Sequence, residues 1–194
     1  MELQANLDRL CAWTDNWGMS FNVLKCHVMH LGLHNSRNVY TMNGVRLETT
    51  ETERDIGVLV ANSLKPAQQC RKAAQTANMV LGQITRSFHY RDRHVFLSLY
   101  RQYVRPHLEF AVVAWAPWTK ADIESLEAVQ KRAVKAISGL RGSTYEDKLS
   151  ELGLQSLQDR RREVDMIQTY KIINGIDTDN SDLWFQRADT RRPT

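Results

Sequence analysis

The sequence predicts an α+β fold, in which a small N-terminal part made of a helix and an antiparallel sheet precedes an all-helical lobe. The first sixty residues combine one helix-like segment with short β-branched runs that glycine and asparagine separate. From Pro66 to about Phe88 the chain is rich in Ala, Gln, Arg and Lys, a composition that favours helix. We therefore expect domains at residues 1–63 and 64–175 and a flexible tail at 176–194.

The N-terminal helix is predicted over residues 2–17, where apolar side chains recur at intervals of three and four. Gly18 is expected to end it, as glycine commonly does one position beyond a helix. The apolar stripe consists of Leu3, Leu7, Leu10, Trp13 and Trp17.

Short strands are predicted next, at residues 25–31, 39–42, 45–47 and 55–60. Asn43-Gly44 lies between two apolar-alternating runs, which is the strongest short-range signal for an antiparallel hairpin. The spacing of Cys26, His30 and His34 would suit a metal site on a helix. Because the surrounding pattern indicates strand and turn, we expect free thiols and scattered histidines instead.

The second part is predicted to contain only helices. Beyond residues 66–88, they are expected at 93–104, at 108–115 as a buried continuation, and at 120–137, 144–152 and 157–174. Pro106 is expected to stop or kink the second of these. In the helix at 120–137 the inward residues are expected to be Ile123, Leu126, Val129, Ala133, Val134 and Ile137.

Composition limits the class of protein. Hydrophobic residues make up 42% and charged residues 25%, as in ordinary globular domains. No run of about 18 apolar residues occurs, so no membrane-spanning helix or membrane partner is expected. The N-terminus lacks the apolar core of a secretory signal, and three widely spaced cysteines argue against a disulfide framework. An intracellular, reducing compartment is therefore expected.

The net charge of +4 is unevenly distributed. Residues 64–140 hold 12 Lys/Arg against 5 Asp/Glu, whereas the segments before and after are slightly acidic. A basic middle can hold a polyanion such as a nucleic-acid backbone. Solvated helix faces produce the same count, so charge leaves both interpretations open.

Several motifs resemble reverse transcriptases of non-LTR retrotransposons (LINE elements), of the jockey and chicken-repeat type. A W-x3-W-x-M-x-F-N-x2-K-C segment at residues 13–26 resembles polymerase motif D. The YTMNG and DIGV runs at residues 40–44 and 55–58 resemble the next hairpin, motif E or the primer grip. Further segments that resemble the family's thumb occur at residues 99–110, 113–117, 126–133, 145–149 and 157–165. Their order and spacing over about 170 residues make the match specific.

This resemblance implies a palm remnant at residues 1–63 and a thumb-like domain at 64–175. In the family, nucleotidyl transfer depends on aspartates that hold two Mg²⁺ ions. One of them lies in an earlier motif and the others in an Ala-Asp-Asp turn that directly precedes a helix like residues 3–10. Those carboxylates are expected to lie before this chain, so we expect it to bind no cofactor and to be inactive as an RNA-directed DNA polymerase by itself.

The resemblance also implies roles for individual palm residues. Lys25 matches the motif D lysine, which is proposed to protonate the leaving pyrophosphate; the alternative is a surface lysine on a strand edge. Ile56, Gly57 and Val58 match the primer-grip turn, where a glycine permits close approach to primer phosphates. The alternative is an ordinary hairpin that needs glycine to bend.

The thumb-like segment would contact an RNA/DNA template–primer through its basic residues, or these would be solvated helix faces. Trp115 and Trp118 could stack on bases, but their place after an apolar run favours a buried core. The cluster at residues 160–162 favours local helix salt bridges. The candidate nucleic-acid contacts are Arg71, Lys72, Arg86, Arg91, Arg93, Arg101, Arg105, Lys131, Arg132 and Lys135.

Three functional hypotheses follow. The chain is a reverse-transcriptase piece of transposable-element origin, a domesticated non-enzymatic module that binds nucleic acid through its basic middle, or a module retained for protein interaction. If the middle lobe works as a thumb, Arg71, Arg86, Arg91, Arg93 and Arg105 should gather on one face, near the turn at residues 56–58. Otherwise they should scatter around the helices and pair with nearby carboxylates such as Glu109.

Overall fold

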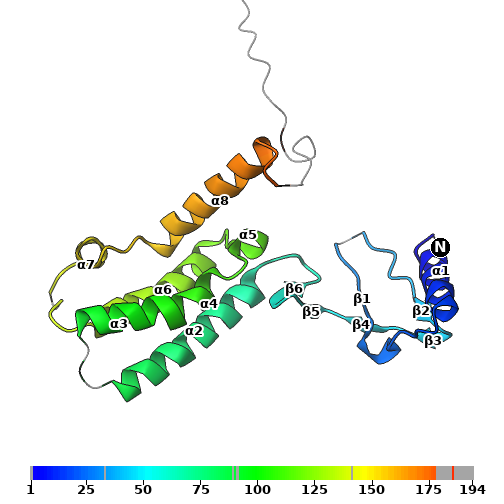
Figure 1. Ribbon diagram of the computed structural model, residues 1–194, viewed down its shortest axis with the longest axis horizontal. Coiled ribbons are helices and arrows are strands. Elements are labelled where there is room, and N and C mark those ends of the chain that lie inside the picture. The colour runs from blue at the N-terminus through cyan, green and yellow to red at the C-terminus, as the bar shows by residue number, and fades with distance from the viewer. Residues whose placement is uncertain are drawn as a thin grey trace, which may run out of the picture. The chain divides into compact units, whose positions relative to one another are not determined.

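The computed structural model describes residues 2–32, 34–88, 90, 92–140, 142–177 and 185. The chain divides into two compact units, residues 1–69 and 70–194, drawn in Figure 1 with the elements labelled. The first unit mixes helix and short strands, and the described part of the second contains only helices. The α+β prediction is therefore confirmed.

The first unit starts with α1 (Glu2–Asn16), which the positive φ of Gly18 follows, as predicted. A short 3₁₀ turn η1 (Val23–Lys25) leads into β1 (His27–Met29). The strand predicted at residues 25–31 is therefore shorter, because its first residue belongs to the preceding turn.

The predicted hairpin is confirmed. β2 (Thr41–Met42) pairs antiparallel with β3 (Val45–Arg46), and both residues of the connecting turn, Asn43 and Gly44, have positive φ. That conformation matches the right-handed twist of hairpin strands, which explains why Asn-Gly is favoured there.

Two features of the sheet differ from the prediction. β4 (Glu48–Thr50) pairs in parallel with β1, because the intervening stretch is long enough to bring the chain back in the same direction. The strand expected at residues 55–60 is instead the end of β5 (Thr52–Asp55), a turn at Ile56-Gly57, and the start of β6 (Val58–Ala61). The unit thus holds three two-stranded ladders, one of them parallel.

The core of the first unit is small. It consists of Cys11, Met42 and Leu47, with Leu7 and Phe21 among the half-buried residues packed against it. The side chain of Gln4 fixes α1 to β2, because it accepts from the N–H of Thr41 at 3.0 Å and donates to the carbonyl of Thr41 at 2.9 Å.

Most of the apolar stripe of α1 faces outward. Leu7 is half-buried, but Leu3, Leu10, Trp13 and Trp17 are exposed, the last at 68%. Cys11 and Thr14 are the buried residues of this helix, so the side that packs on the strands is rotated away from the two tryptophans. Four of the five stripe positions are therefore exposed.

This stripe predicts self-association at micromolar concentration, because contiguous exposed apolar surface drives contact between copies. Replacing both Trp13 and Trp17 by serine should shift the chain toward monomer in sedimentation velocity. The matched control is Leu24→Ser, since Leu24 is 88% exposed but lies outside the stripe. Equal sedimentation of the wild type and the double variant would show that the stripe does not drive association.

The second unit begins within α2 (Ala67–Ser87) and continues through α3 (Arg93–Leu99), a π-helical segment η2 (Tyr100–Val104) and α4 (Arg105–Glu109). Pro106 does not stop the helix, and the turn before it is π-helical instead of α-helical. Proline has no N–H to donate and its ring crowds the carbonyl four residues earlier. The wider π turn, in which the N–H of Arg105 bonds the carbonyl of Tyr100, precedes it and keeps the chain helical.

The continuous helix predicted at residues 108–115 is wrong. The chain breaks at Phe110 and Ala111, where Ala111 has a φ of +51°, before α5 (Val112–Trp115). The indole N–H of Trp115 donates to the carbonyl of Phe110 at 2.8 Å, which secures this break. Trp115 is buried as predicted, but Trp118 is 66% exposed and its predicted burial is wrong.

The remaining helices agree with the prediction to within one residue at each end. They are α6 (Lys120–Ala136), α7 (Tyr145–Leu152) and α8 (Leu157–Ile173). Thr119, Thr144 and Ser156 cap their N-termini by accepting from a backbone N–H, as short hydroxyl side chains do. Among the described residues no helix is long and apolar enough to cross a membrane. Apart from Phe185, the predicted tail lies outside the described residues beyond Asp177.

Candidate functional site

Lys25 lies in η1 rather than on a strand. Its side chain is exposed, and its backbone N–H donates to the carbonyl of Asn22 at 3.0 Å. The alternative, a surface lysine on a strand edge, is therefore right about the exposure of Lys25 but wrong about the strand. Its proposed proton-donating role would require a pyrophosphate held by residues outside this chain.

The three residues matched to the primer grip surround a tight turn. Ile56 has a φ of +44° and is 88% exposed, and Gly57 has a φ of +89°. Val58 pairs with Asp55 across the hairpin. A positive φ at a β-branched residue is an energetic outlier, of the kind that concentrates at functional turns and ligand clamps. The turn presents Ile56 and a glycine backbone at the tip of a hairpin.

Five of the candidate basic residues have partners inside the helical lobe. Arg93 pairs with Glu151 at 3.1 Å, and Arg105 with Glu109 at 3.6 Å. Arg101 donates to the carbonyl of Gly153 at 3.0 Å. Lys131 lies 5.1 Å from the centre of the Tyr145 ring, and Arg132 donates to the side chain of Asn78.

Three others remain available. Lys72, Arg86 and Lys135 are exposed and make no hydrogen bond or ion pair within the described ranges. Arg71 is exposed as well, and it has a partner. Arg91 lies outside the described residues.

Helix geometry places these residues on two surfaces that adjoin. At about 100° per residue, Arg71, Lys72 and Arg86 fall within roughly 100° of one another around α2, opposite the buried positions such as Ala77 and Leu81. Lys131, Arg132 and Lys135 occupy a similar arc on α6. The bond from Arg132 to Asn78 joins the two helices at the edge of these arcs.

We call these six residues, Arg71, Lys72, Arg86, Lys131, Arg132 and Lys135, the α2–α6 basic surface. Arg93 and Arg105 of the predicted group pair with Glu151 and Glu109 instead.

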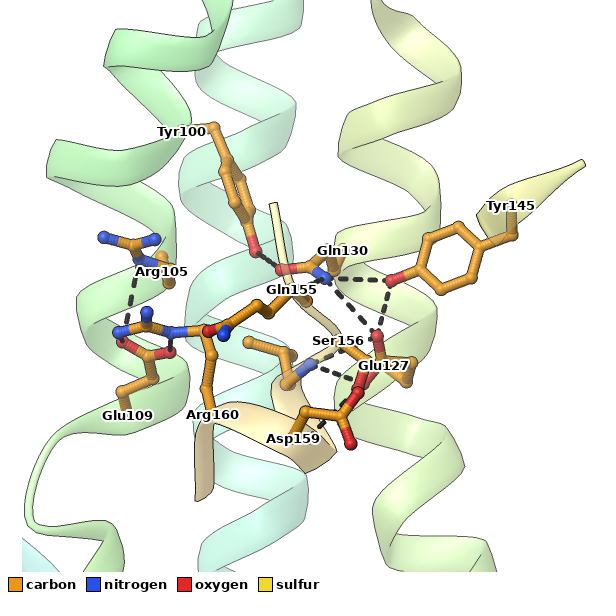
Figure 2. Close-up of polar contacts among 11 residues, drawn as sticks. Tyr100, Arg105, Glu109, Glu127, Gln130, Tyr145, Gln155, Ser156, Asp159 and Arg160 are labelled. Carbon is orange, nitrogen blue, oxygen red and sulfur yellow. Dashed lines mark hydrogen bonds and ion pairs between the residues drawn. The ribbon is translucent and has the colours of Figure 1, made fainter. Parts of the chain in front are cut away.

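A polar network lies at the centre of the helical lobe (Figure 2). Gln130 is fully buried; its amide oxygen accepts from the hydroxyl of Tyr100 at 2.5 Å. Its amide nitrogen donates to the hydroxyl of Tyr145 and to the carbonyl of Gln155, each at 2.9 Å. One side chain of α6 thereby joins η2, α7 and the segment before α8.

Glu127 is the anionic part of this network. Its carboxylate accepts from the hydroxyl of Tyr145 and from the N–H of Leu157, the latter at 3.1 Å. Only 9% of the residue is exposed, so these donors replace water around a buried charge. The arrangement holds α7 and the start of α8 against α6.

Both tyrosines are kept protonated. Burial raises the pKa of Tyr100 above its ordinary range, and the carboxylate of Glu109 raises it further. Burial also raises the pKa of Tyr145, which donates a hydrogen bond to Glu127. Neither hydroxyl is an available base, so the network stabilises the lobe instead of offering a proton acceptor.

A second charged group adjoins the network, as Figure 2 shows. Glu109 is bound by Arg160 through two hydrogen bonds and also by Arg105. Arg162 makes the local bond to Asp159 that sequence favours, but Arg160 reaches across to α4. Arg161 is only 5% exposed, and burial lowers the pKa of its guanidinium while Glu127 opposes that shift.

Sequence reasoning overlooked Glu127 and Gln130, and it expected a local salt bridge for Arg161, whose terminal nitrogens have no partner among the described residues. A signal was present in their spacing. Glu127 and Gln130 follow Ile123 and Leu126 by four residues, and Arg161 follows Leu157 by four, so all three occupy inward-facing positions of apolar stripes. In the described ranges, no group of three His, Cys, Asp or Glu could hold a metal ion. No family model, curated protein or solved structure matches this chain.

Proposed function

We propose that this chain is the part of a reverse transcriptase, related to those of non-LTR retrotransposons, that follows the catalytic aspartates. In this proposal residues 1–63 are the end of the palm, and the helical lobe is the thumb. The full enzyme would use Mg²⁺ through carboxylates outside this chain. The part described here would hold the template–primer and carry out no nucleotidyl transfer alone.

The observation that carries this proposal is the α2–α6 basic surface. Lys72, Arg86 and Lys135 carry charge that no carboxylate in the described ranges neutralises by direct contact. Phosphate contacts of this kind give affinity without sequence preference, which a polymerase that must copy any template needs. The motif order along the chain supports the same proposal.

Two features of the first unit also support it. Ile56 is held at a positive φ and is exposed at a hairpin tip, which suits a turn that touches a ligand. The outward-facing Trp13 and Trp17 suit a helix that packs on a larger sheet. A module retained for protein interaction would share the second feature but would not need the basic surface.

Binding to an RNA–DNA hybrid tests this function. The logarithm of the binding constant should fall linearly with the logarithm of salt concentration, with a slope of roughly −3 to −5 for four to six phosphate contacts. Fluorescence anisotropy at several salt concentrations measures this slope. Arg86→Glu should weaken binding to all hybrid sequences alike and make the slope shallower, because phosphate contacts carry no base information.

The matched control is Arg162→Glu, which changes the net charge equally on a helix outside the basic surface. Its affinity should stay closer to that of the wild type than the affinity of Arg86→Glu does. Equal losses in both variants would mean that only total charge matters. Undetectable hybrid binding at low salt would reject the proposal and favour a protein-interaction module.

A further inference from the structure

A pocket of about 290 Å³ lies in the helical lobe where α4, α5 and α8 meet. Ala111, Val112, Val113 and Val164 form its apolar lining. Glu109, Arg160 and Arg161 supply the charged part. Sites for small organic molecules combine a mainly apolar wall with a few placed polar groups in this way.

Arg161 gives this pocket its chemical character. The side chain is almost completely buried, and neither terminal guanidinium nitrogen has a hydrogen-bond partner among the described residues. An arginine has only donors and stays charged, so it needs acceptor oxygens when it leaves water. Buried polar atoms without partners are uncommon, which makes this orphaned group the most unusual one in the lobe.

The neighbouring carboxylates are already engaged. Glu109 is bound by Arg160 and Arg105, and Glu127 by Tyr145 and the N–H of Leu157. Glu127 and, to a smaller extent, Glu109 act on the charge of Arg161 through space. Arg161 makes no ion pair among the described residues, so its charge is compensated only through space.

We propose that this pocket binds a small aliphatic carboxylate, with its carboxylate accepting from Arg161 and its hydrocarbon part against Val112, Val113 and Val164. Arginine matches a carboxylate through parallel N–H···O bonds, and the valines exclude water from the rest of the ligand. A carboxylate would give the Arg161 guanidinium the direct partner that it lacks among the described residues. The inference concerns a site separate from the α2–α6 basic surface and does not depend on the proposed function.

Isovalerate is a suitable probe, because it combines a carboxylate with a branched hydrocarbon of the kind that the pocket wall would accept. With the full chain at constant ionic strength, we expect its addition to raise the midpoint of thermal unfolding in a saturable way. In ¹H–¹⁵N spectra the amides of Val112 and Val113 should shift with the same saturation curve. Isovaleramide, which has the same shape without the charge, and inorganic phosphate should give neither response.

Two variants and a matched control locate the effect. Arg161→Met should abolish the response to isovalerate, and Arg162→Met, one residue along the same helix, should preserve it. Val113→Phe enlarges a side chain that lines the pocket and leaves Arg161 unchanged in sequence, and it should weaken binding at least tenfold. If Arg161→Met does not fold, Val113→Phe tests the proposal in its place.

Three outcomes would overturn the proposal. They are the absence of a saturable isovalerate response in the wild type, an equal response to isovaleramide, and an unchanged response in folded Arg161→Met or in Val113→Phe. The first would mean that the pocket binds no aliphatic carboxylate.

Discussion

Replacing Glu127 by alanine should destabilise the helical lobe by about 3–5 kcal/mol, the range found when one partner of a buried charge group is removed. The substitution takes away the acceptor for the Leu157 N–H and the Tyr145 hydroxyl. It also removes the largest favourable influence on the buried charge of Arg161. Urea unfolding followed by helical circular dichroism measures the loss.

A matched control comes from the same helix. Glu124 is exposed and pairs with Lys120 at 3.7 Å, so Glu124→Ala should cost at most about 0.5 kcal/mol. The double variant Glu127→Met with Arg161→Met removes both buried charges and should recover much of the stability that Glu127→Ala loses. A loss below about 1 kcal/mol for Glu127→Ala would contradict the compensating role assigned to this carboxylate.

The helical lobe should lose stability steeply above pH 10. Tyr100 and Tyr145 have folded-state pKa values raised above the unfolded value of about 10. Groups of this kind stabilise the folded state fully below the unfolded pKa, and their contribution is lost as pH rises toward the folded pKa. Burial also raises the pKa of the Cys70 thiol to about 11. The stabilising contribution of this protonated thiol therefore declines as the pH rises toward 11. Above its unfolded pKa, each group that stays protonated in the folded state lowers the free energy of unfolding by up to about 1.4 kcal/mol per pH unit.

Urea midpoints between pH 8 and pH 11.5 test this expectation. Tyr100→Phe and Tyr145→Phe should each lower stability at pH 8, because a buried hydrogen bond is lost, yet make the decline above pH 10 shallower. Tyr170→Phe is the control, since Tyr170 is exposed on α8, and it should leave the decline unchanged. A decline of equal slope in all four proteins would assign the alkaline loss to other groups.

Local chemistry explains which elements could be predicted from the sequence. Asn43-Gly44 specifies its hairpin through the positive φ that both residues accept, and no distant contact is needed. The boundaries of α2 and α6 follow from composition, capping residues and apolar spacing, which act within a few turns of helix. These signals also determined the α+β class.

Features that depend on non-local geometry were mistaken or overlooked. The parallel pairing of β1 with β4 depends on the path of the chain between them. The exposure of Trp118 depends on which surface the neighbouring helices cover. The break at Ala111 is local, since the Trp115 indole bonds to the carbonyl of Phe110 five residues earlier, but the apolar composition gives no sign of it. The apolar run at residues 108–115 reads the same with or without that break.

The candidate site divides in the same way. Sequence alone determined that the middle of the chain is basic, since charge is a property of the chain itself, and the thumb assignment that rests on motif order stays a prediction. Only the tertiary structure decided that Arg93, Arg101 and Arg105 have partners inside the lobe, whereas Lys72, Arg86 and Lys135 remain available. It alone placed Glu127, Gln130 and Arg161 in the interior, because burial and pairing depend on which side chains from distant segments meet in space.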